Sequence, residues 1–553
     1  MRPFLRGGRA IGCRPLAFGA GLNVRPGDIL MVEKGRRPVA HRLVEIARTG
    51  SGETILTTQG DRSRSVEAVT PFEVVGKVTH VLWRNGAVVS LEAGFAGRIQ
   101  RVFGRMSVRH FRLDKRAGGG LGPRARSLFR ALLNPVFQGL VEAAARFDRM
   151  RRPSAYRAVR AEAWSFLRRW AAEGGGIGTR PSVYALQAVF DHDLAGWIDR
   201  TVHEPEWRPL EDQKRRQIAA AIGGLSEYER IAAACQARGI PVIPLKAVSL
   251  AYGIYRPDPS VRAFGDIDLL ILPETTAAFV ACLAELGYRP GRNVFLKPGI
   301  LAIKKKFELL APPGSSGMGL DIKLSLVTRR VYGAEADLPT AFAFARASVP
   351  SGERPFVRLL DPADEWLYLA QHFVLHHRFG GLKWLIDLDR LARGMRPGDR
   401  EALVRRAAES GLVRIAATAV RAVEKILGPL PEGWSPLRRA GLGPIAGGWT
   451  RLALQPRAML ERRFRPRHGR WLNKIEEIHW EVPFIDGRAA RIRAFLRRAF
   501  PSPNEMDAYW GTRLGPAYIL LWPGHVVVWT VSGLVFLADL GIRSLLAQWT
   551  GRT

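Results

Sequence analysis

Two aspartates separated by one residue, Asp266 and Asp268, open an apolar run that continues Leu-Leu-Ile. Such a run predicts a buried strand, and residues i and i+2 of a strand point to the same face. Unpaired carboxylates are costly to bury, and a divalent cation is the usual reason for two of them to share a buried face. The pair therefore predicts a metal site at the start of a strand.

A third acid, Asp321, lies near the start of a second apolar run, residues 319–327, which predicts another strand. If this strand lies beside the first, three carboxylates converge at one sheet edge. They could bind one or two Mg²⁺ or Mn²⁺ ions that bridge nucleotide phosphates, and Asp321 could instead act as a general base. The alternatives without metal are a helix cap or an ion pair with Arg262 for the first two acids, and a plain surface position for Asp321.

Phosphate ligands are predicted upstream of the acids. A strand gives way to a helix at Lys246, and a helix N-terminus after a strand is a natural phosphate site. Lys246 would add a charge, Ser249 a hydroxyl, and Arg262 a guanidinium that clamps phosphate or neutralises the acids.

Secondary candidates lie in a later helical stretch that contains His372, His376 and His377. On an α-helix the first two share a face, where they could bind metal or simply pack. Asp387 could reach a histidine or cap the chain locally, and Trp384 is expected in the core.

The elements that position these residues form a multidomain α+β protein. Residues 1–95 contain short strands rich in branched residues, separated by turns. An α/β core with a mixed sheet is expected at residues 239–327, between helical stretches that include residues 180–238, 360–430 and 438–500. Breaks in the first of these stretches are expected at Arg208-Pro209 and Gly223-Gly224. The predicted segments are 1–95 (β domain), 96–127 (basic Gly-rich linker), 128–184 (helical connector), 185–350 (core), 351–510 (helical subdomain) and 511–553 (apolar C-terminal segment).

The run LKAVSLAYGIYRPDPSVRAFGDIDLLI resembles an uncharacterised nucleotidyltransferase family of the polymerase-β-type superfamily. The resemblance covers roughly residues 185–510 and includes Gly287-Tyr288, the acid strand at Asp321, the histidines and LKWLID at 382–387. It implies Mg²⁺ or Mn²⁺ at Asp266, Asp268 and Asp321, and transfer of a nucleoside monophosphate from an NTP to a hydroxyl. Two residues depart from the family pattern: Ala247 replaces a glycine, and Lys323 replaces a histidine.

Residues 19–78 resemble a signal-peptidase-type β domain through RPGDIL, AHRLVE, TTQGD and VVGKV. The resemblance aligns His41 with the base and Asp61 with the acid of that fold, but the nucleophile position falls on Gly19. An acyl-transfer mechanism needs an oxygen or sulfur nucleophile there, so the domain is interpreted as degenerate.

Charge and composition restrict the partners. Lys and Arg total 84 against 50 Asp and Glu, a net charge of +34 that reflects either codon bias or attraction to polyanions. No RNA-module motif is visible. Three widely spaced cysteines fit a reducing cytoplasm. The uncharged segment 515–538, with arginines before it, predicts either contact with an anionic membrane or a buried or interfacial helix.

The leading hypothesis is a cytoplasmic or membrane-associated nucleotidyltransferase with an unidentified acceptor, which could be a small molecule, a sugar or a peptide. A second hypothesis is a non-catalytic binding protein built on two degenerate enzyme folds, which Ala247, Lys323 and Gly19 motivate. A serine peptidase is the third.

Overall fold

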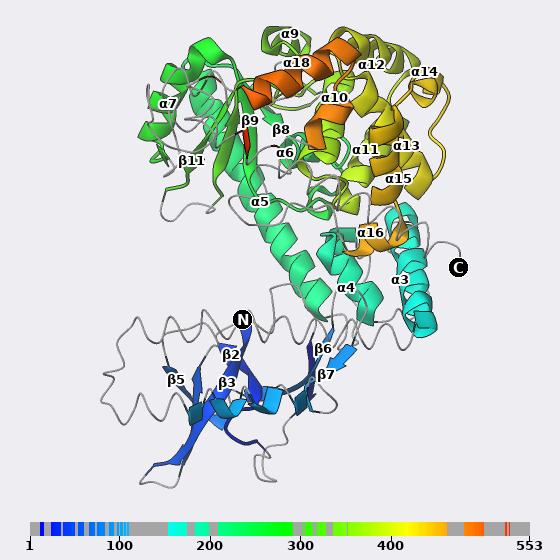
Figure 1. Ribbon diagram of the computed structural model, residues 1–553. Helices are drawn as coiled ribbons and strands as arrows, with labels where there is room; N and C mark the ends of the chain where they lie inside the picture. The colour runs from blue at the N-terminus through cyan, green and yellow to red at the C-terminus, as the bar shows by residue number, and fades with distance from the viewer. Residues whose placement is uncertain are drawn as a thin grey trace. The chain divides into compact units, whose positions relative to one another are not determined.

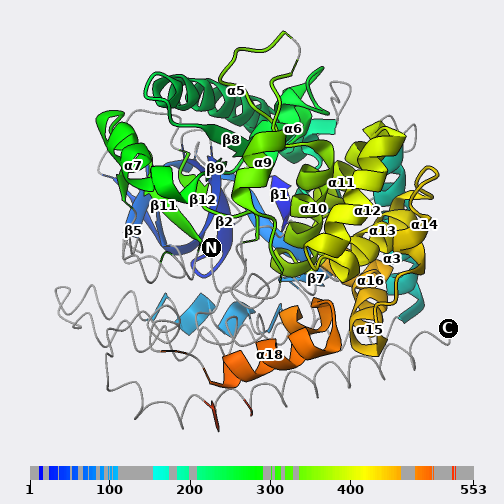
Figure 2. The ribbon, with the colours of Figure 1, turned by 90° about the horizontal axis from the view of Figure 1, so that it is seen from above.

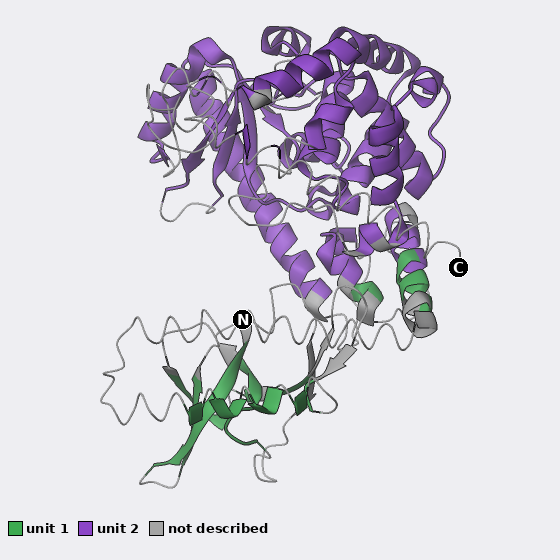
Figure 3. Cartoon of the chain, viewed as in Figure 1, with its two compact units in different colours: residues 1–164, 181–187 green, residues 165–180, 188–553 purple. Residues whose placement is uncertain are grey.

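The computed structural model describes residues 11–109, 153–173, 183–197, 208–290, 301–350, 352–461 and 480–502, with short gaps inside the first, fifth and last ranges, and residues 526, 527 and 530. The chain divides into two compact units (Figure 3): unit 1 comprises residues 1–164 and 181–187, and unit 2 comprises residues 165–180 and 188–553.

Unit 1 contains a seven-stranded antiparallel sheet. Its strands are β1 (Ile11–Pro15), β2 (Ile29–Lys34), β3 (Arg37–Arg48), β4 (Thr54–Gln59), β5 (Val66–Val69), β6 (Val74–Leu82) and β7 (Val88–Ser90). The order is β1-β6-β2-β3-β4-β5, with β7 also paired to β6. Alternating apolar residues such as Leu30, Val32 and Leu43 form its core. The β-rich N-terminal region expected from the sequence is therefore confirmed, with β1 and β5 in addition.

The predicted linker at residues 96–127 begins with helix instead. Most of residues 97–109 are described, and those residues are helical. Val108 is buried, and Gly104 lies so close to Gly27 that a Cβ on Gly104 would stand 2.9 Å from the Gly27 carbonyl oxygen. The basic, Gly-rich run at residues 116–122, on which the linker prediction rests, lies outside the described residues.

Unit 2 is built on a five-stranded mixed sheet of order β10-β11-β12-β9-β8. The strands are β8 (Val242–Leu245), β9 (Ile267–Ile271), β10 (Arg289–Pro290), β11 (Lys306–Leu310) and β12 (Leu320–Lys323). β12 runs parallel to β9, and the other pairs are antiparallel. The mixed sheet agrees with the prediction.

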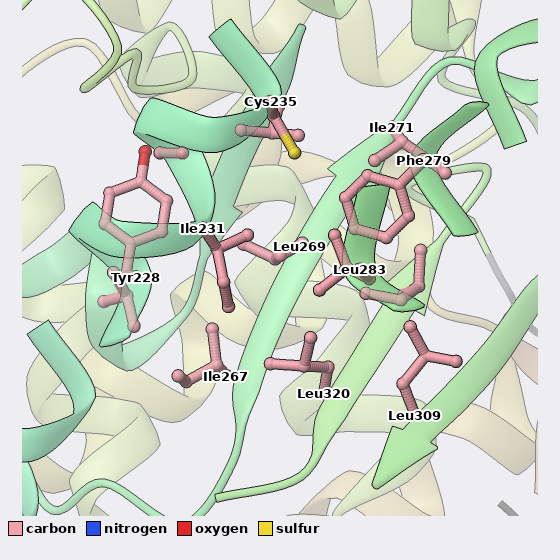
Figure 4. Packing of buried hydrophobic residues seen from close by; sticks show 14 of the residues in the cluster. Tyr228, Ile231, Cys235, Ile267, Leu269, Ile271, Phe279, Leu283, Leu309 and Leu320 are labelled. Atoms are coloured by element: carbon pink, nitrogen blue, oxygen red, sulfur yellow. The ribbon is translucent and has the colours of Figure 1, made fainter. Parts of the chain in front are cut away.

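One face of this sheet carries the hydrophobic core (Figure 4). Ile267, Leu269 and Ile271 of β9 point to this face, toward α5 (Arg208–Gln236) and α7 (Thr276–Glu285). Leu320 of β12 and Leu309 of β11 extend the same layer. Because side chains alternate along a strand, the intervening residues must point to the opposite face.

Helix α5 runs through Gly223-Gly224 without the predicted break. A Cβ on Gly224 would stand 2.8 Å from the Phe264 ring and 3.2 Å from the Met318 sulfur. The glycine therefore allows α5 to pack closely against its neighbours. From the local sequence alone, the same glycine pair is interpreted as a helix breaker. The other predicted break is correct, because α5 begins at Arg208-Pro209.

Helices α3 (Pro153–Glu173) and α4 (Val183–Asp191) are divided between the units, with residues 153–164 and 183–187 in unit 1. A helical group follows the sheet in sequence: α9 (Thr340–Arg346), α10 (Pro362–Gln371), α11 (Leu382–Gly394), α12 (Pro397–Glu409) and α13 (Val413–Leu427). Figures 1 and 2 show α10–α13 side by side. The chain continues in α14 (Ser435–Arg439), α15 (Pro444–Ala453), α16 (Pro456–Glu461) and α18 (Arg488–Ala499).

The apolar segment 515–538 lies almost entirely outside the described residues. Within the described part of the chain, no helix combines the length and the apolar character needed to cross a bilayer.

Candidate functional site

The charged residues of the site lie on the face of the sheet opposite the core. In register, Asp321 of β12 lies beside Asp268 of β9, and Lys323 lies beside Leu270. Lys306 of β11 faces Lys323 across the next strand pair. The alternation that sends Ile267 and Leu320 to the core thus sends Asp268, Asp321 and both lysines to the other face.

Three carboxylates meet on this face. One oxygen from each of Asp266, Asp268 and Asp321 lies within 4.8 Å of the others. Asp266 is exposed and immediately precedes β9, Asp268 is 2 % exposed, and Asp321 is intermediate. The expected convergence of the third acid with the pair is therefore present, because β12 pairs with β9.

Lysine ammonium groups are interleaved with the carboxylates. Lys246 Nζ lies 2.7 Å from Asp268 Oδ1, and Lys323 Nζ lies 3.5 Å from the same oxygen. Lys323 also donates to Asp321 Oδ2, which Lys306 Nζ approaches to 3.4 Å. Three positive and three negative groups thus occupy one small region.

This arrangement perturbs the pKa values of its members. Although Asp266 reaches the surface, desolvation by the surrounding protein, followed by the charge of Asp268, raises its pKa above the ordinary value. Burial alone would raise the pKa of Asp321 too, but Lys323 and Lys306 outweigh it and lower that pKa. Burial also lowers the pKa of Lys323, whereas at Lys246 the neighbouring aspartates overcome burial and raise the pKa. Shifts in opposite directions within one cluster are typical of functional sites.

The residues fit a divalent cation. Three carboxylate oxygens at this spacing are hard oxygen ligands of the kind that Mg²⁺ and Mn²⁺ prefer. Asp321 Oδ1 is buried and has no hydrogen-bond partner among the described residues, and after desolvation the charge of Asp268 is the largest cause of the raised pKa of Asp266. The ammonium of Lys323 competes for the same oxygens.

The turn that precedes α6 (Ala247–Tyr252) has its strained residue at Lys246, where φ is 54°. Ala247 is the first helical residue and does not have a positive φ. Alanine at 247 therefore creates no backbone conflict, because the left-handed conformation that favours glycine lies one residue earlier. Lys246 is instead held by its ion pair with Asp268.

Ser249 does not face an open phosphate site. It is fully buried in α6 near the carboxyl of Glu365 on α10, and its hydroxyl has no hydrogen-bond partner among the described residues. Burial raises the pKa of Glu365 to about 7, and the neighbouring Ser249 hydroxyl only partly opposes this. The residues between Lys246 and Ser249 gave no indication that Ser249 would lie near Glu365 of α10.

Arg262 also differs from the prediction, because it neutralises another acid. Its Nε donates to Asp387 Oδ2 at 2.8 Å, and its guanidinium lies over the Trp384 ring at 4.5 Å. Tyr255 donates a second hydrogen bond to Asp387. Asp387 therefore neither reaches a histidine nor caps the chain locally but anchors a buried network, and Trp384 is in the core as expected.

The histidines lie in a π-helical turn, η7 (His372–His376), that continues α10. His372, His376 and His377 each offer a ring nitrogen within 4.8 Å of the others. Burial, then Lys246 and the other two histidines, lowers the pKa of His372 well below its ordinary value. Lys246 and Lys323 of the carboxylate cluster both contribute to this lowered pKa, so the histidines lie within electrostatic range of that cluster.

Tyr368 of α10 is a site residue that the sequence did not indicate. Its hydroxyl is buried without a hydrogen-bond partner among the described residues. Burial, followed by the charges of Asp268, Asp321 and Asp266, raises its pKa well above the ordinary value. Its spacing of four from His372 was the only available signal, since both then lie on one helix face.

In unit 1, His41 Nδ1 lies 3.2 Å from Glu67 Oε2, so the described acid beside His41 is Glu67. Asp61 and Gly19, the other positions of the predicted peptidase constellation, lie outside the described residues.

A comparison with family models found a match for part of unit 2. Residues 198–428 match the family described as uncharacterised nucleotidyltransferase. The matched range includes the three aspartates, the three lysines and the three histidines described above for unit 2, and the match supports a nucleotidyltransferase. Comparisons with curated proteins and with solved structures found no match. The signal-peptidase-like interpretation of residues 19–78 has no support from these comparisons and stays a prediction.

Proposed function

We propose that unit 2 transfers a nucleoside monophosphate from an NTP to a hydroxyl acceptor and releases pyrophosphate. The observation that carries the proposal is the meeting of Asp266, Asp268 and Asp321 on one face of the sheet. The family match supports nucleotidyl transfer in general; the NTP, the acceptor and the ion belong to the proposal.

In this proposal the three aspartates hold Mg²⁺ or Mn²⁺, which supplies charge stabilisation to the phosphates in an in-line displacement. The acceptor oxygen forms a bond to the α-phosphorus as the bond from that phosphorus to the bridging oxygen breaks. Pyrophosphate leaves with the bond electrons, and the acceptor proton passes to a carboxylate or to water.

Two lysines bind different partners before and after substrate binding in the same proposal. Lys246 and Lys323 neutralise the carboxylates before substrate binds, and their ammonium groups turn to the phosphates when a divalent cation replaces them. The buried Tyr368 hydroxyl, which lies near the aspartates, is placed to donate to a phosphate or an acceptor oxygen.

The test is titration calorimetry of the full chain with a non-hydrolysable NTP analogue, with and without Mg²⁺. We expect binding that depends on Mg²⁺ in the parent and its loss in Asp266→Ala. Asp389→Ala is the matched control, because Asp389 is a partly exposed aspartate paired with Arg393 on α11. Unchanged nucleotide and Mg²⁺ binding in Asp266→Ala would refute the proposal.

A second candidate function is a non-catalytic binding protein. Lys323 motivates it, because its ammonium contacts both Asp268 and Asp321 and so occupies the position of a cation. On this hypothesis the carboxylates and lysines form a structural network, and the parent binds none of the four common NTPs in the presence of Mg²⁺. The same calorimetry distinguishes the two candidates.

A further inference from the structure

The three histidines that follow α10 form a compact cluster of ring nitrogens. His372 Nε2 and His377 Nε2 lie 2.9 Å apart, and a nitrogen of His376 completes a group within 4.8 Å. The rings are in contact: the centroids of His372 and His376 are 4.7 Å apart and nearly parallel, and those of His372 and His377 are 4.5 Å apart and nearly perpendicular.

The π-helical turn is what brings the third histidine to the cluster. On an α-helix of 3.6 residues per turn, residues 372 and 377 would lie about 140° apart around the axis. In the structure the His377 amide donates to the His372 carbonyl at 3.0 Å, which is the i to i+5 hydrogen bond of a π-helix. This wider turn aligns His377 with His372, and single π-turns often occur at functional sites.

The chain ends this turn in an unfavourable backbone conformation. Arg378 and Phe379 have φ values of 46° and 63°, although neither is glycine. Such strain persists only where the surrounding structure enforces it. Phe379 is buried and packs against Phe373 and Trp480, so packing of its side chain fixes the strained turn.

The surroundings of the cluster are those of a rigid, partly open ligand site. Trp384 stacks on His377 at 4.5 Å, and Tyr368 stacks on His372 at 6.2 Å. His376 is exposed, which provides access from solvent. The rings are thus oriented by aromatic neighbours, while one edge of the cluster remains reachable.

We propose that His372, His376 and His377 bind a transition-metal ion, with Zn²⁺ as the expected occupant. Zn²⁺ binds imidazole nitrogen at about 2.0–2.1 Å, so two nitrogens on one ion can be at most about 4.2 Å apart. The measured 2.9 Å between two of the nitrogens falls inside that limit, and modest ring rotation brings in the third. Imidazole ligands select Zn²⁺ and its transition-metal neighbours over Mg²⁺.

Three protein ligands leave a coordination position for water or an anionic oxygen, as in zinc sites that act on substrates. The cluster lies within electrostatic range of the carboxylates, since Lys246 and Lys323 of that site contribute to the lowered pKa of His372. The two sites differ in chemistry: one offers carboxylate oxygens and the other imidazole nitrogens. The zinc proposal therefore does not depend on nucleotidyl transfer.

The test uses the full chain after removal of metals with a chelator. We expect one Zn²⁺ to bind in calorimetry in the presence of excess Mg²⁺, and Co²⁺ at the same site to show the visible absorption of nitrogen coordination. His376→Ala and His377→Ala should each weaken Zn²⁺ binding by more than the roughly 10- to 100-fold that the loss of an outer-shell partner costs.

Two controls separate this site from others. His41→Ala removes a histidine of unit 1 that pairs with Glu67, and Asp389→Asn alters a partly exposed aspartate of α11 that pairs with Arg393; neither should change Zn²⁺ affinity. X-ray absorption of the zinc-loaded parent needs no variant and should show imidazole ligands. Three results would overturn the proposal: absence of stoichiometric Zn²⁺ binding, a Zn²⁺ affinity of both cluster variants equal to that of the parent, or a zinc spectrum dominated by oxygen ligands.

Discussion

Replacement of Lys323 by methionine tests whether the carboxylates are built for a divalent cation. The Lys323 ammonium lies 3.5 Å from Asp268 Oδ1 and also donates to Asp321 Oδ2. Methionine preserves most of the side-chain volume and removes the charge. In Lys323→Met the aspartates lose a competing cation, and a divalent ion no longer meets a positive charge within the cluster.

The expected magnitude follows from Coulomb's law. At an effective dielectric constant of about 20, a divalent ion and an ammonium about 4 Å apart repel by roughly 8 kcal/mol. If side-chain movement and screening remove about two thirds of this energy, about 3 kcal/mol remains, which corresponds to roughly 100-fold tighter Mg²⁺ binding. Without Mg²⁺ the variant should be less stable by about 3–5 kcal/mol, because a buried ion pair loses one partner.

The assay is chemical unfolding of parent and variant in chelator and in Mg²⁺, together with Mg²⁺ calorimetry. Binding to the folded state alone should restore the variant's stability as Mg²⁺ is added. Lys77→Met is the matched control, since it breaks a partly buried ion pair of 3.0 Å with Asp28 in unit 1. A Lys323→Met variant that is destabilised but neither binds Mg²⁺ more tightly nor recovers with it would refute the reasoning and favour the non-catalytic hypothesis.

Two further predictions concern the buried residues of unit 2. Because burial raises the pKa of Glu365 from 4.5 to about 7, the folded state retains a proton that the unfolded chain releases, so stability falls as the pH rises through this window. In pH-dependent unfolding, Glu365→Gln should match the parent at about pH 4 and exceed it by up to about 3 kcal/mol at about pH 8, whereas the exposed control Glu409→Gln should not. Gly224→Ala should lower the free energy of unfolding by about 1–3 kcal/mol, because its Cβ would meet the Phe264 ring at 2.8 Å. Gly398→Ala on α12 has open space and should be neutral or stabilising by up to about 1 kcal/mol; equal effects at both glycines would contradict the packing argument.

Much of the site's sheet could be predicted because strand alternation is local. Asp266 and Asp268 share a face because they are two residues apart, and the apolar residues between and after them identify the buried strand. The same pattern located Asp321 at the start of a strand. That the two strands are neighbours was only a condition of the prediction, because pairing of β9 with β12 joins residues more than fifty positions apart.

The partners of the other candidates could not be predicted from short sequence spacings. Arg262 appeared close to the aspartates in sequence, yet it pairs with Asp387, 125 residues away. Ser249 is buried near Glu365, which belongs to another helix. A buried charge or hydroxyl takes whichever partner the fold presents, and that choice depends on helix packing.

The sequence by itself determined the residue types and the periodicity that place the carboxylates on one strand face of unit 2. Tertiary structure decided which of these residues meet. Parallel pairing of β12 with β9 joined Asp321 to Asp268 and brought Lys323 with it, and a π-turn added His377 to His372 and His376. The physical reason is that periodicity fixes the direction of a side chain relative to its own element, whereas contacts between elements depend on pairing and packing across the whole chain.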